Sequence, residues 1–206
     1  GGPLGATTNI YYLLWEFGFA TLSVGWSSAS AVILFLGFGV LAKACARVLS
    51  GFDFDLACWS RNPKAVAGIE SFHGPEGLVA FLARTEILVC LLPLTPQTTG
   101  ILDQALFAGL PRGAWLINAG RGGHQVEADI LAALESGQLA GAALDVFQSE
   151  PLPADHPFWP HPKITISPHI ASVTQPRSAA REVVANIRRV EAGGVPLNMV
   201  DVQAGY

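Results

Sequence analysis

Short apolar runs alternate with amphipathic stretches along most of the chain. The run "AVILFL" at residues 31–36 ends at a glycine, which is typical of a strand buried on both faces of a parallel sheet. A helix is predicted over residues 40–50, with Gly51 as its C-terminal stop. Further strands are predicted at 55–59, 86–92, 114–119, 140–147 and 163–167, and further helices at 75–85, 103–110, 127–137 and 177–192. Strands that alternate with helices predict a parallel α/β sheet.

A glycine-rich turn joins the first predicted strand to its helix. Residues 37–42 read G-x-G-x-x-A: Gly37 permits a tight turn, Gly39 lets the backbone approach a pyrophosphate, and Ala42 lets the helix pack on the strand. The phosphates of such a ligand lie at the helix N-terminus. A turn of this kind can also be a plain packing device, but its place between strand and helix favours a cofactor. We therefore expect a doubly wound parallel sheet, that is, a Rossmann-type dinucleotide-binding domain.

The end of the second predicted strand indicates which dinucleotide binds. A carboxylate at this place would hold the ribose 2′-hydroxyl of NAD, whereas the chain reads "CWSRNPK", with Ser60, Arg61 and Lys64. Asp53 and Asp55 precede the strand, at the edge of the sheet away from the cofactor. Cations favour a 2′-phosphate, so NADPH is the predicted cofactor. The alternative is that Arg61 and Lys64 are ordinary solvated charges.

Three further segments place polar residues where predicted strands end. "CLLPLTPQTTGIL" at 90–102 leaves a strand through two prolines, which make the loop rigid. "INAGRGG" at 117–123 holds Arg121 between glycines, where its guanidinium could bind a carboxylate through two hydrogen bonds. "TISPHIAS" at 165–172 puts His169 behind a proline. The histidine is either a general acid–base or merely tolerated at a strand end.

Composition narrows the class of protein. With 206 residues, 50% of them hydrophobic and 14% charged, the chain is long enough for one full domain with a sizeable core, or one domain plus an incomplete second piece. The net charge of −4 and the lack of a Lys/Arg cluster argue against nucleic acid and favour a small-molecule ligand. Cys45, Cys58 and Cys90 are far apart without CxxC spacing, so we expect buried thiols in a reducing cytoplasm.

The N-terminal segment raises the question of a membrane span. Residues 17–42 contain no charged side chain, and Glu16 is the only one in the first forty-two residues. Serines, a threonine and four glycines interrupt this stretch, and no basic region precedes it as in a signal peptide. Its second half is better explained as a buried strand and glycine turn. We therefore expect no membrane span.

These motifs, in this order, resemble the D-isomer-specific 2-hydroxyacid dehydrogenases, and most closely the glyoxylate/hydroxypyruvate reductase branch. The matching stretches are "LGFGVLA", "WSRNPK", "LLPLTPQTTGIL", "INAGRGGHQVEADILAALESG", "LDVFQSEPLP", "HPFWPHPKITISPHIAS" and the terminal "GY". The resemblance implies that Arg121 binds the substrate carboxylate and carbonyl, that His169 is the acid–base, and that Glu150 orients His169. It places cofactor contacts at Gly37, Gly39, Val40, Leu41, Ser60, Arg61, Lys64, Leu92, Pro93, Thr98, Ala119, Asp145 and Ser172, with Asp145 beside the nicotinamide amide.

These roles agree with general chemistry. Hydride addition to a keto carbon creates an alkoxide that needs a proton from a group titrating near neutrality, and a neighbouring carboxylate favours the protonated imidazole. We therefore predict NADPH-dependent reduction of glyoxylate or hydroxypyruvate to the 2-hydroxy acid. A metal site at His156, His161 and His169 is disfavoured by their spacing and by the prolines between them. Glu127 and Asp129 stand at a helix start, where capping and dipole roles are favoured over a catalytic pair.

The N-terminal part departs from the family. Members carry a substrate-binding domain ahead of the glycine turn, whereas thirty-six residues precede Gly37 here. We divide the chain into an unassigned apolar N-terminus at 1–30, an NADP-binding domain at 31–192 and a tail at 193–206. Two hypotheses remain: an active cytoplasmic reductase, or a dinucleotide-binding fragment with little or no turnover. A homodimer is one assembly that the first hypothesis allows.

Overall fold

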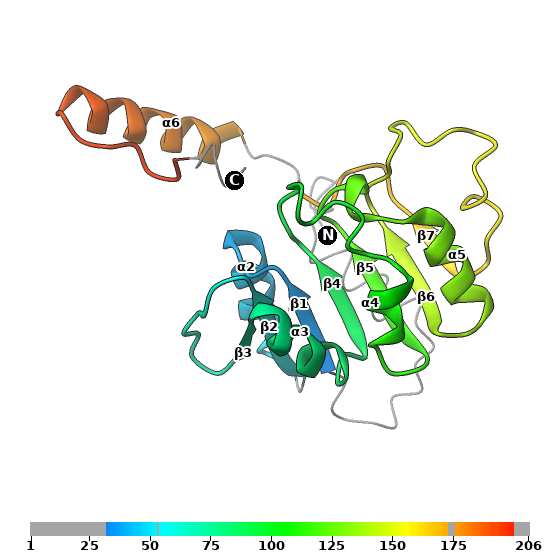
Figure 1. The fold of residues 1–206 in the computed structure, drawn as a ribbon. Helices are drawn as coiled ribbons and strands as arrows, with labels where there is room; N and C mark the ends of the chain where they lie inside the picture. Colours follow the sequence, from blue (N-terminus) through cyan, green and yellow to red (C-terminus); the bar gives the residue numbers. More distant parts are fainter. Residues whose placement is uncertain (1–31, 53, 173–175, 200–206) are drawn as a thin grey trace.

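The computed structural model describes residues 32–52, 54–172 and 176–199 of the chain (Figure 1). The strands are β1 (Val32–Leu36), β2 (Asp55–Ser60), β3 (Glu70–His73), β4 (Ile87–Cys90), β5 (Ala114–Asn118), β6 (Leu139–Leu144) and β7 (Ile164–Ile166). The helices are α2 (Val40–Leu49), α3 (Gly74–Leu82), α4 (Gln104–Ala108), α5 (Glu127–Glu135) and α6 (Pro176–Glu191), with a 3₁₀ turn, η3 (Gly122–His124). The N-terminus at 1–30, including its apolar stretch, and tail residues 200–206 lie outside the described residues.

All seven strands form one parallel sheet in the order β3-β2-β1-β4-β5-β6-β7. From β1 the chain first moves outward to β3, then returns to β4 on the other side of β1 and continues outward to β7 (Figure 1). The carboxyl ends of β1 and β4 are therefore the point at which the winding direction reverses. The predicted doubly wound, Rossmann-type sheet is confirmed.

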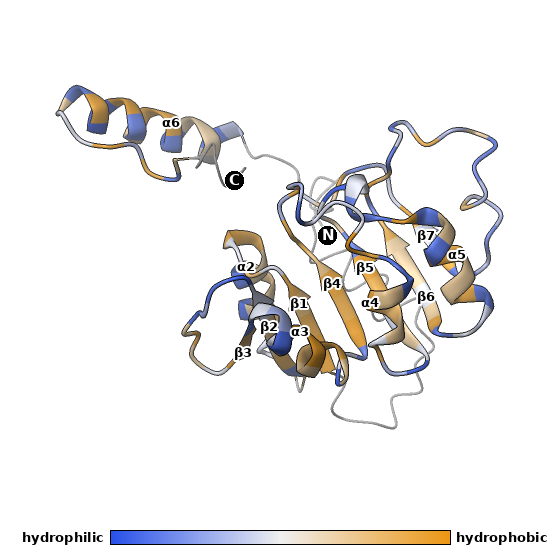
Figure 2. Ribbon diagram, in the orientation of Figure 1, coloured by the Kyte–Doolittle hydropathy of each residue, from blue (hydrophilic) through white to orange (hydrophobic). Residues whose placement is uncertain are grey.

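Successive residues of a strand point to opposite sides of the sheet, so apolar side chains project from both faces. Helices cover both faces and bury these side chains. Leu34 and Leu88 belong to a core shared with α3, α4 and α5, whereas Phe35 and Val89 pack in a second core with α2. The central strands are hydrophobic along their length, as their orange colour in Figure 2 shows, and most of their residues are buried. Cys45, Cys58 and Cys90 are buried and free, in agreement with the prediction of buried thiols.

The structure corrects one prediction and adds one strand. Gly51 is not a left-handed stop, because α2 ends at Ser50 in right-handed helical geometry. Ser50 N–H donates to Ala46 O at 2.8 Å and Gly51 N–H donates to Val48 O at 3.2 Å, so the last turn closes without a left-handed residue. The edge strand β3 reads "ESFH" and is only partly buried, so no apolar run marked it. In the described part of the chain, no helix is long and apolar enough to cross a membrane.

Candidate functional site

The glycine turn lies where the winding of the sheet reverses. Gly37 has a φ of 96°, and a Cβ there would lie 3.0 Å from the backbone nitrogen of Leu92, so this position requires glycine. A Cβ on Gly39 would meet nothing within 4 Å, which leaves open space above the N-terminus of α2. The turn therefore brings the chain that follows β1 against the chain that follows β4 and leaves room beside α2.

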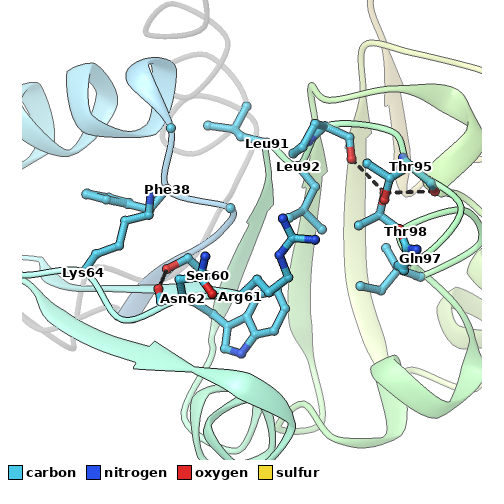
Figure 3. Close-up of a pocket in the computed structure, with 15 residues that line it drawn as sticks. Phe38, Ser60, Arg61, Asn62, Lys64, Leu91, Leu92, Thr95, Gln97 and Thr98 are labelled. Carbon is cyan, nitrogen blue, oxygen red and sulfur yellow. Dashed lines mark hydrogen bonds between the residues drawn. The ribbon is translucent and has the colours of Figure 1, made fainter. Parts of the chain in front are cut away.

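Two pockets meet at this turn and form one groove. The first has a volume of about 270 Å³, with Ser60, Arg61 and Lys64 on the β2 side and Thr95 and Thr98 opposite (Figure 3). The second, of about 520 Å³, runs along the N-terminus of α2 to the loop after β5. Both are lined by Gly39, Leu91, Leu92 and Pro93, so the groove extends from Arg61 to Arg121.

The groove fits a phosphorylated dinucleotide. No side chain caps the N-terminus of α2, and its first turn contains no acidic residue, so its amide groups are available to a phosphate. Arg61 and Lys64 add two cations at the end of β2 that opens onto the groove. Together these features suit a pyrophosphate at the helix and a further phosphate at the β2 end.

The loop after β4 is held by its own hydroxyl groups. Thr98 donates to the carbonyl of Pro93 at 2.7 Å and accepts from the N–H of Thr95 at 2.8 Å. The Thr99 hydroxyl donates to the carbonyl of Thr95 at 2.9 Å. The wall of the groove formed by residues 91–98 is therefore braced internally.

Arg121 follows β5 on a tightly packed turn. Asn118 fixes this turn from inside, since its Oδ1 accepts from Gly120 N–H at 3.1 Å and its Nδ2 donates to Arg121 O at 3.2 Å. A Cβ on Gly122 would lie 1.8 Å from the carbonyl oxygen of Phe147, so the turn lies directly against the segment that follows β6. This contact joins the Arg121 turn to the segment that carries Glu150.

His169 and Glu150 form a hydrogen-bonded pair at the same end of the sheet. Nδ1 of His169 donates to Oε2 of Glu150 at 2.7 Å, and Glu150 Oε1 accepts from the N–H of Phe147 at 2.9 Å. Partial burial acts to raise the pKa of Glu150, but these hydrogen bonds and the charges of His169 and Arg121 lower it below its usual value. The pair lines a third pocket of about 420 Å³ with Leu152, Trp159 and others.

Asp145 organises the turn that carries His169. Its carboxylate is buried and accepts from the Ser167 hydroxyl at 2.5 Å and from the N–H groups of Ile170 and Ala171 at 2.9 Å each. Its backbone oxygen accepts from His169 N–H at 2.8 Å. A carboxylate has about four acceptor positions, so these three bonds leave room for one more partner, such as an amide. The cofactor contact of Asp145 stays a prediction.

The structure brings most of the predicted cofactor residues together. The groove is lined by Gly37, Gly39, Val40, Leu41, Ser60, Arg61, Lys64, Leu92, Pro93, Thr98 and Ala119. Asp145 and the exposed Ser172 are not among its lining residues. The groove is also lined by residues that were not predicted, among them Trp59, Thr95, Gln97 and Gly120, and these four lie inside the motifs that were recognised. Their positions one or two residues from predicted contacts were the available signal.

The other candidate residues have structural partners. Nε2 of His156 lies 3.2 Å from Oε2 of Glu127, and Asp129 accepts from the N–H of Gln104 at the first residue of α4. Glu127 and Asp129 lie in the first turn of α5, as the predicted dipole role requires, but neither caps the helix, because its N-cap is Val126 and no side chain bonds there. Within the described ranges, no group of three or more His, Cys, Asp and Glu side chains could hold a metal ion.

Comparison with protein families and curated relatives gives consistent matches. A family model described as "D-isomer specific 2-hydroxyacid dehydrogenase, NAD binding domain" matches residues 20–171. Glyoxylate/hydroxypyruvate reductase A from Serratia proteamaculans (strain 568) is 55% identical over 171 residues, which are 83% of this chain and 55% of that protein. The homologue from Yersinia enterocolitica is 54% identical over the same shares. The chain spans about half the length of the curated relatives it matches.

Solved structures give the same match in three dimensions. The NADPH-dependent glyoxylate/hydroxypyruvate reductase from Sinorhizobium meliloti, in complex with NADP and sulfate, has a TM-score of 0.82 at 45% identity, over 85% of this chain and 57% of that one. A D-isomer specific 2-hydroxyacid dehydrogenase from Xanthobacter autotrophicus Py2, in complex with NADPH and MES, has a TM-score of 0.85 at 42% identity. That match covers 98% of this chain and 85% of the other.

Proposed function

This chain belongs to the D-isomer-specific 2-hydroxyacid dehydrogenases, and from that premise we propose that it binds NADPH and serves the reduction of a small 2-keto acid, glyoxylate or hydroxypyruvate, to the 2-hydroxy acid. The single observation that carries the proposal is the convergence at one sheet edge of a dinucleotide groove, Arg121 and the hydrogen-bonded pair His169–Glu150. The matched relatives that bear the name glyoxylate/hydroxypyruvate reductase support the substrate class.

The groove accounts for the choice of cofactor. The chemistry that bound NADPH supplies is a hydride for the keto carbon. Gly37 and Gly39 admit its pyrophosphate to the N-terminus of α2, and Arg61 with Lys64 binds the 2′-phosphate through charge-assisted hydrogen bonds. Ser60, buried at the end of β2, donates its hydroxyl to the Asn62 carbonyl at 2.7 Å, which holds the turn that carries these cations.

Arg121 and His169 act on the substrate. The Arg121 guanidinium binds the carboxylate and, as negative charge grows on the carbonyl oxygen, stabilises it. His169 donates its Nε2 proton to that oxygen as hydride reaches the carbon, which completes the hydroxyl group. Glu150 keeps the proton on Nδ1 by accepting from it, so that Nε2 is the nitrogen that exchanges a proton with substrate.

The cofactor assignment is tested by titrating the purified chain with NADPH and NADH and following protein fluorescence. We expect NADPH to bind at least about ten-fold more tightly, which corresponds to about 1.4 kcal/mol, because NADH lacks the phosphate that Arg61 and Lys64 bind. Arg61→Ala should remove most of this preference. Arg47→Ala is the matched control, since Arg47 is an exposed cation in the last turn of α2, at the end opposite the glycine turn. Equal affinities that Arg61→Ala leaves unchanged would contradict the assignment.

A further inference from the structure

A buried histidine lies behind the Arg121 turn and has no part in the proposed chemistry. His124 ends η3, and its residue surface is 0% exposed. Its Nδ1 lies 3.2 Å from the backbone nitrogen of Arg121, and its Nε2 lies 3.3 Å from the carbonyl oxygen of Pro93. One imidazole therefore connects the residue predicted to bind substrate with the loop that lines the cofactor groove.

The two contacts require a single protonation state. A backbone N–H only donates, so Nδ1 must keep its lone pair to accept from Arg121. A carbonyl oxygen only accepts, so Nε2 must carry the hydrogen that it shares with Pro93. The neutral tautomer protonated at Nε2 satisfies both contacts, whereas the doubly protonated ring would lose the bond to Arg121.

The surroundings favour this neutral form. Burial lowers the pKa of His124 below its usual value, and the positive charge of Arg121 acts in the same direction, although hydrogen bonding to the backbone of Pro93 and of Arg121 opposes them. The Cys90 sulfur lies 3.9 Å from Nδ1, and burial raises the pKa of that thiol to about 12, so it stays a neutral S–H group beside the ring.

Packing holds the ring in this orientation. A Cβ on Gly120 would lie 3.1 Å from both Cε1 and Nδ1 of His124, and 3.2 Å from the carbonyl oxygen of Leu92. The backbone of Gly120 thus lies directly against the imidazole. Backbone hydrogen bonds also hold the 3₁₀ turn itself, because His124 O accepts from Leu102 N–H and Gly123 O accepts from Gly100 N–H.

We propose that His124 is a positioning residue that fixes the Arg121 turn to the cofactor loop through Arg121 N–H···Nδ1 and Nε2–H···O=C Pro93. Its effect on substrate passes through Arg121, so that part of the inference rests on the proposed function. The position of the guanidinium relative to the groove then depends on a buried side chain that contacts neither ligand. Weakening of the Nδ1 contact loosens the Arg121 backbone and leaves the walls of the first pocket, from Ser60 to Lys64, in place.

The tautomer of the wild-type chain gives the first test. Long-range ¹H–¹⁵N NMR of histidine-labelled protein distinguishes a ring protonated at Nε2 from one protonated at Nδ1. We expect the Nε2-protonated neutral form for His124 near neutral pH. An Nδ1-protonated or a doubly protonated ring would overturn the proposal, because neither can accept from the Arg121 amide.

Two substitutions separate the contacts. In His124→Asn the side-chain oxygen lies near the place of Nδ1 and can still accept from Arg121, whereas the amide of His124→Gln reaches toward Pro93 and leaves Arg121 N–H without an acceptor. We expect hydrogen exchange of the Arg121 amide to be about ten-fold faster in His124→Gln, because this variant loses one hydrogen bond to that amide. In His124→Asn the bond is kept, so the exchange rate should stay close to that of the wild type. Equal exchange in all three proteins would overturn the proposal.

A ligand measurement links this effect to the site. Oxalate, an unreactive acid of the size of glyoxylate, is titrated calorimetrically into the NADP⁺-loaded proteins. We expect about ten-fold weaker oxalate binding in His124→Gln, restored in His124→Asn, with NADPH affinity changed in His124→Gln by less than about two-fold. A wild-type chain that binds NADP⁺ but no oxalate counts against the proposed substrate, whereas the tautomer and the Arg121 amide still decide the role of His124.

Discussion

At the scale of single residues, Asp145 holds His169 in a conformation that few side chains adopt. His169 has a φ of 54°, in the left-handed region that is uncommon for residues other than glycine. The Asp145 carboxylate accepts from the two N–H groups that follow His169, at Ile170 and Ala171. The hydrogen bonds of one buried carboxylate thus offset the strain of the turn and aim the imidazole at Glu150.

The pair His169–Glu150 predicts a pH effect. In Glu150→Gln a neutral amide replaces the carboxylate that accepts from Nδ1 of His169 and whose pKa is lowered, so the pH dependence of any keto-acid reduction should change. Rates of NADPH oxidation measured across pH, for the variant and the wild type, check this. His169→Ala should remove most of any turnover and leave NADPH affinity nearly intact. An unchanged pH profile in Glu150→Gln would remove Glu150 from the pair.

His124 predicts a second pH effect, on stability. Because burial lowers its pKa in the folded state, the unfolded chain binds a proton below about pH 6.5 that the folded chain does not bind. Above that pH, His124 does not lower the free energy of unfolding. As the pH falls below it, the free energy of unfolding decreases by at most about 1.4 kcal/mol per pH unit on account of His124. Urea unfolding at several pH values should show a shallower acid loss in His124→Asn than in the wild type. Parallel curves would contradict this.

At the scale of elements, η3 must lie against the segment after β6 for the site to form. A Cβ on Gly122 would overlap the carbonyl of Phe147, which is backbone and cannot rotate away. Gly122→Ala should therefore destabilise the chain by about 2 kcal/mol or more, as measured by denaturant unfolding. In the control Gly123→Ala the new methyl group meets only the half-exposed side chain of Leu94, which can move. Equal stability of the two variants would contradict this reading of the contact.

Elements and site residues were predictable where the signal is local. Strands β1 and β4 are continuous apolar runs, and Gly37, Arg61, Arg121 and His169 follow predicted strand ends, so their common edge follows from a parallel sheet. The edge strand β3 was not predicted, because its residues are only partly buried and its sequence therefore contains no continuous apolar run. His124 was not predicted either, because its partners Pro93 and Arg121 come together only when β4 pairs with β5.

At the scale of the whole molecule, the edge of the sheet that carries the proposed catalytic residues is open. Arg121 is exposed, and the His169 side chain is 46% exposed, so the described part of the chain leaves the proposed substrate position in contact with water. Rate depends strongly on excluding water and aligning substrate with cofactor. We therefore expect this chain to bind NADPH measurably and to reduce glyoxylate very slowly or not at all. Steady-state turnover of about 1 to 1,000 per second would contradict this expectation.

The strand order also determines when β1 becomes fully paired during synthesis. Its neighbour β2 follows after one helix, but its other neighbour is β4, so that Ile33 pairs with Ile87 only after two whole helices and two whole strands have been made. Until then the apolar edge of β1 is bare, and pairing between such distant segments is slow. On the ribosome, the strand that later leads into the glycine turn is therefore exposed to aggregation until β4 has been made.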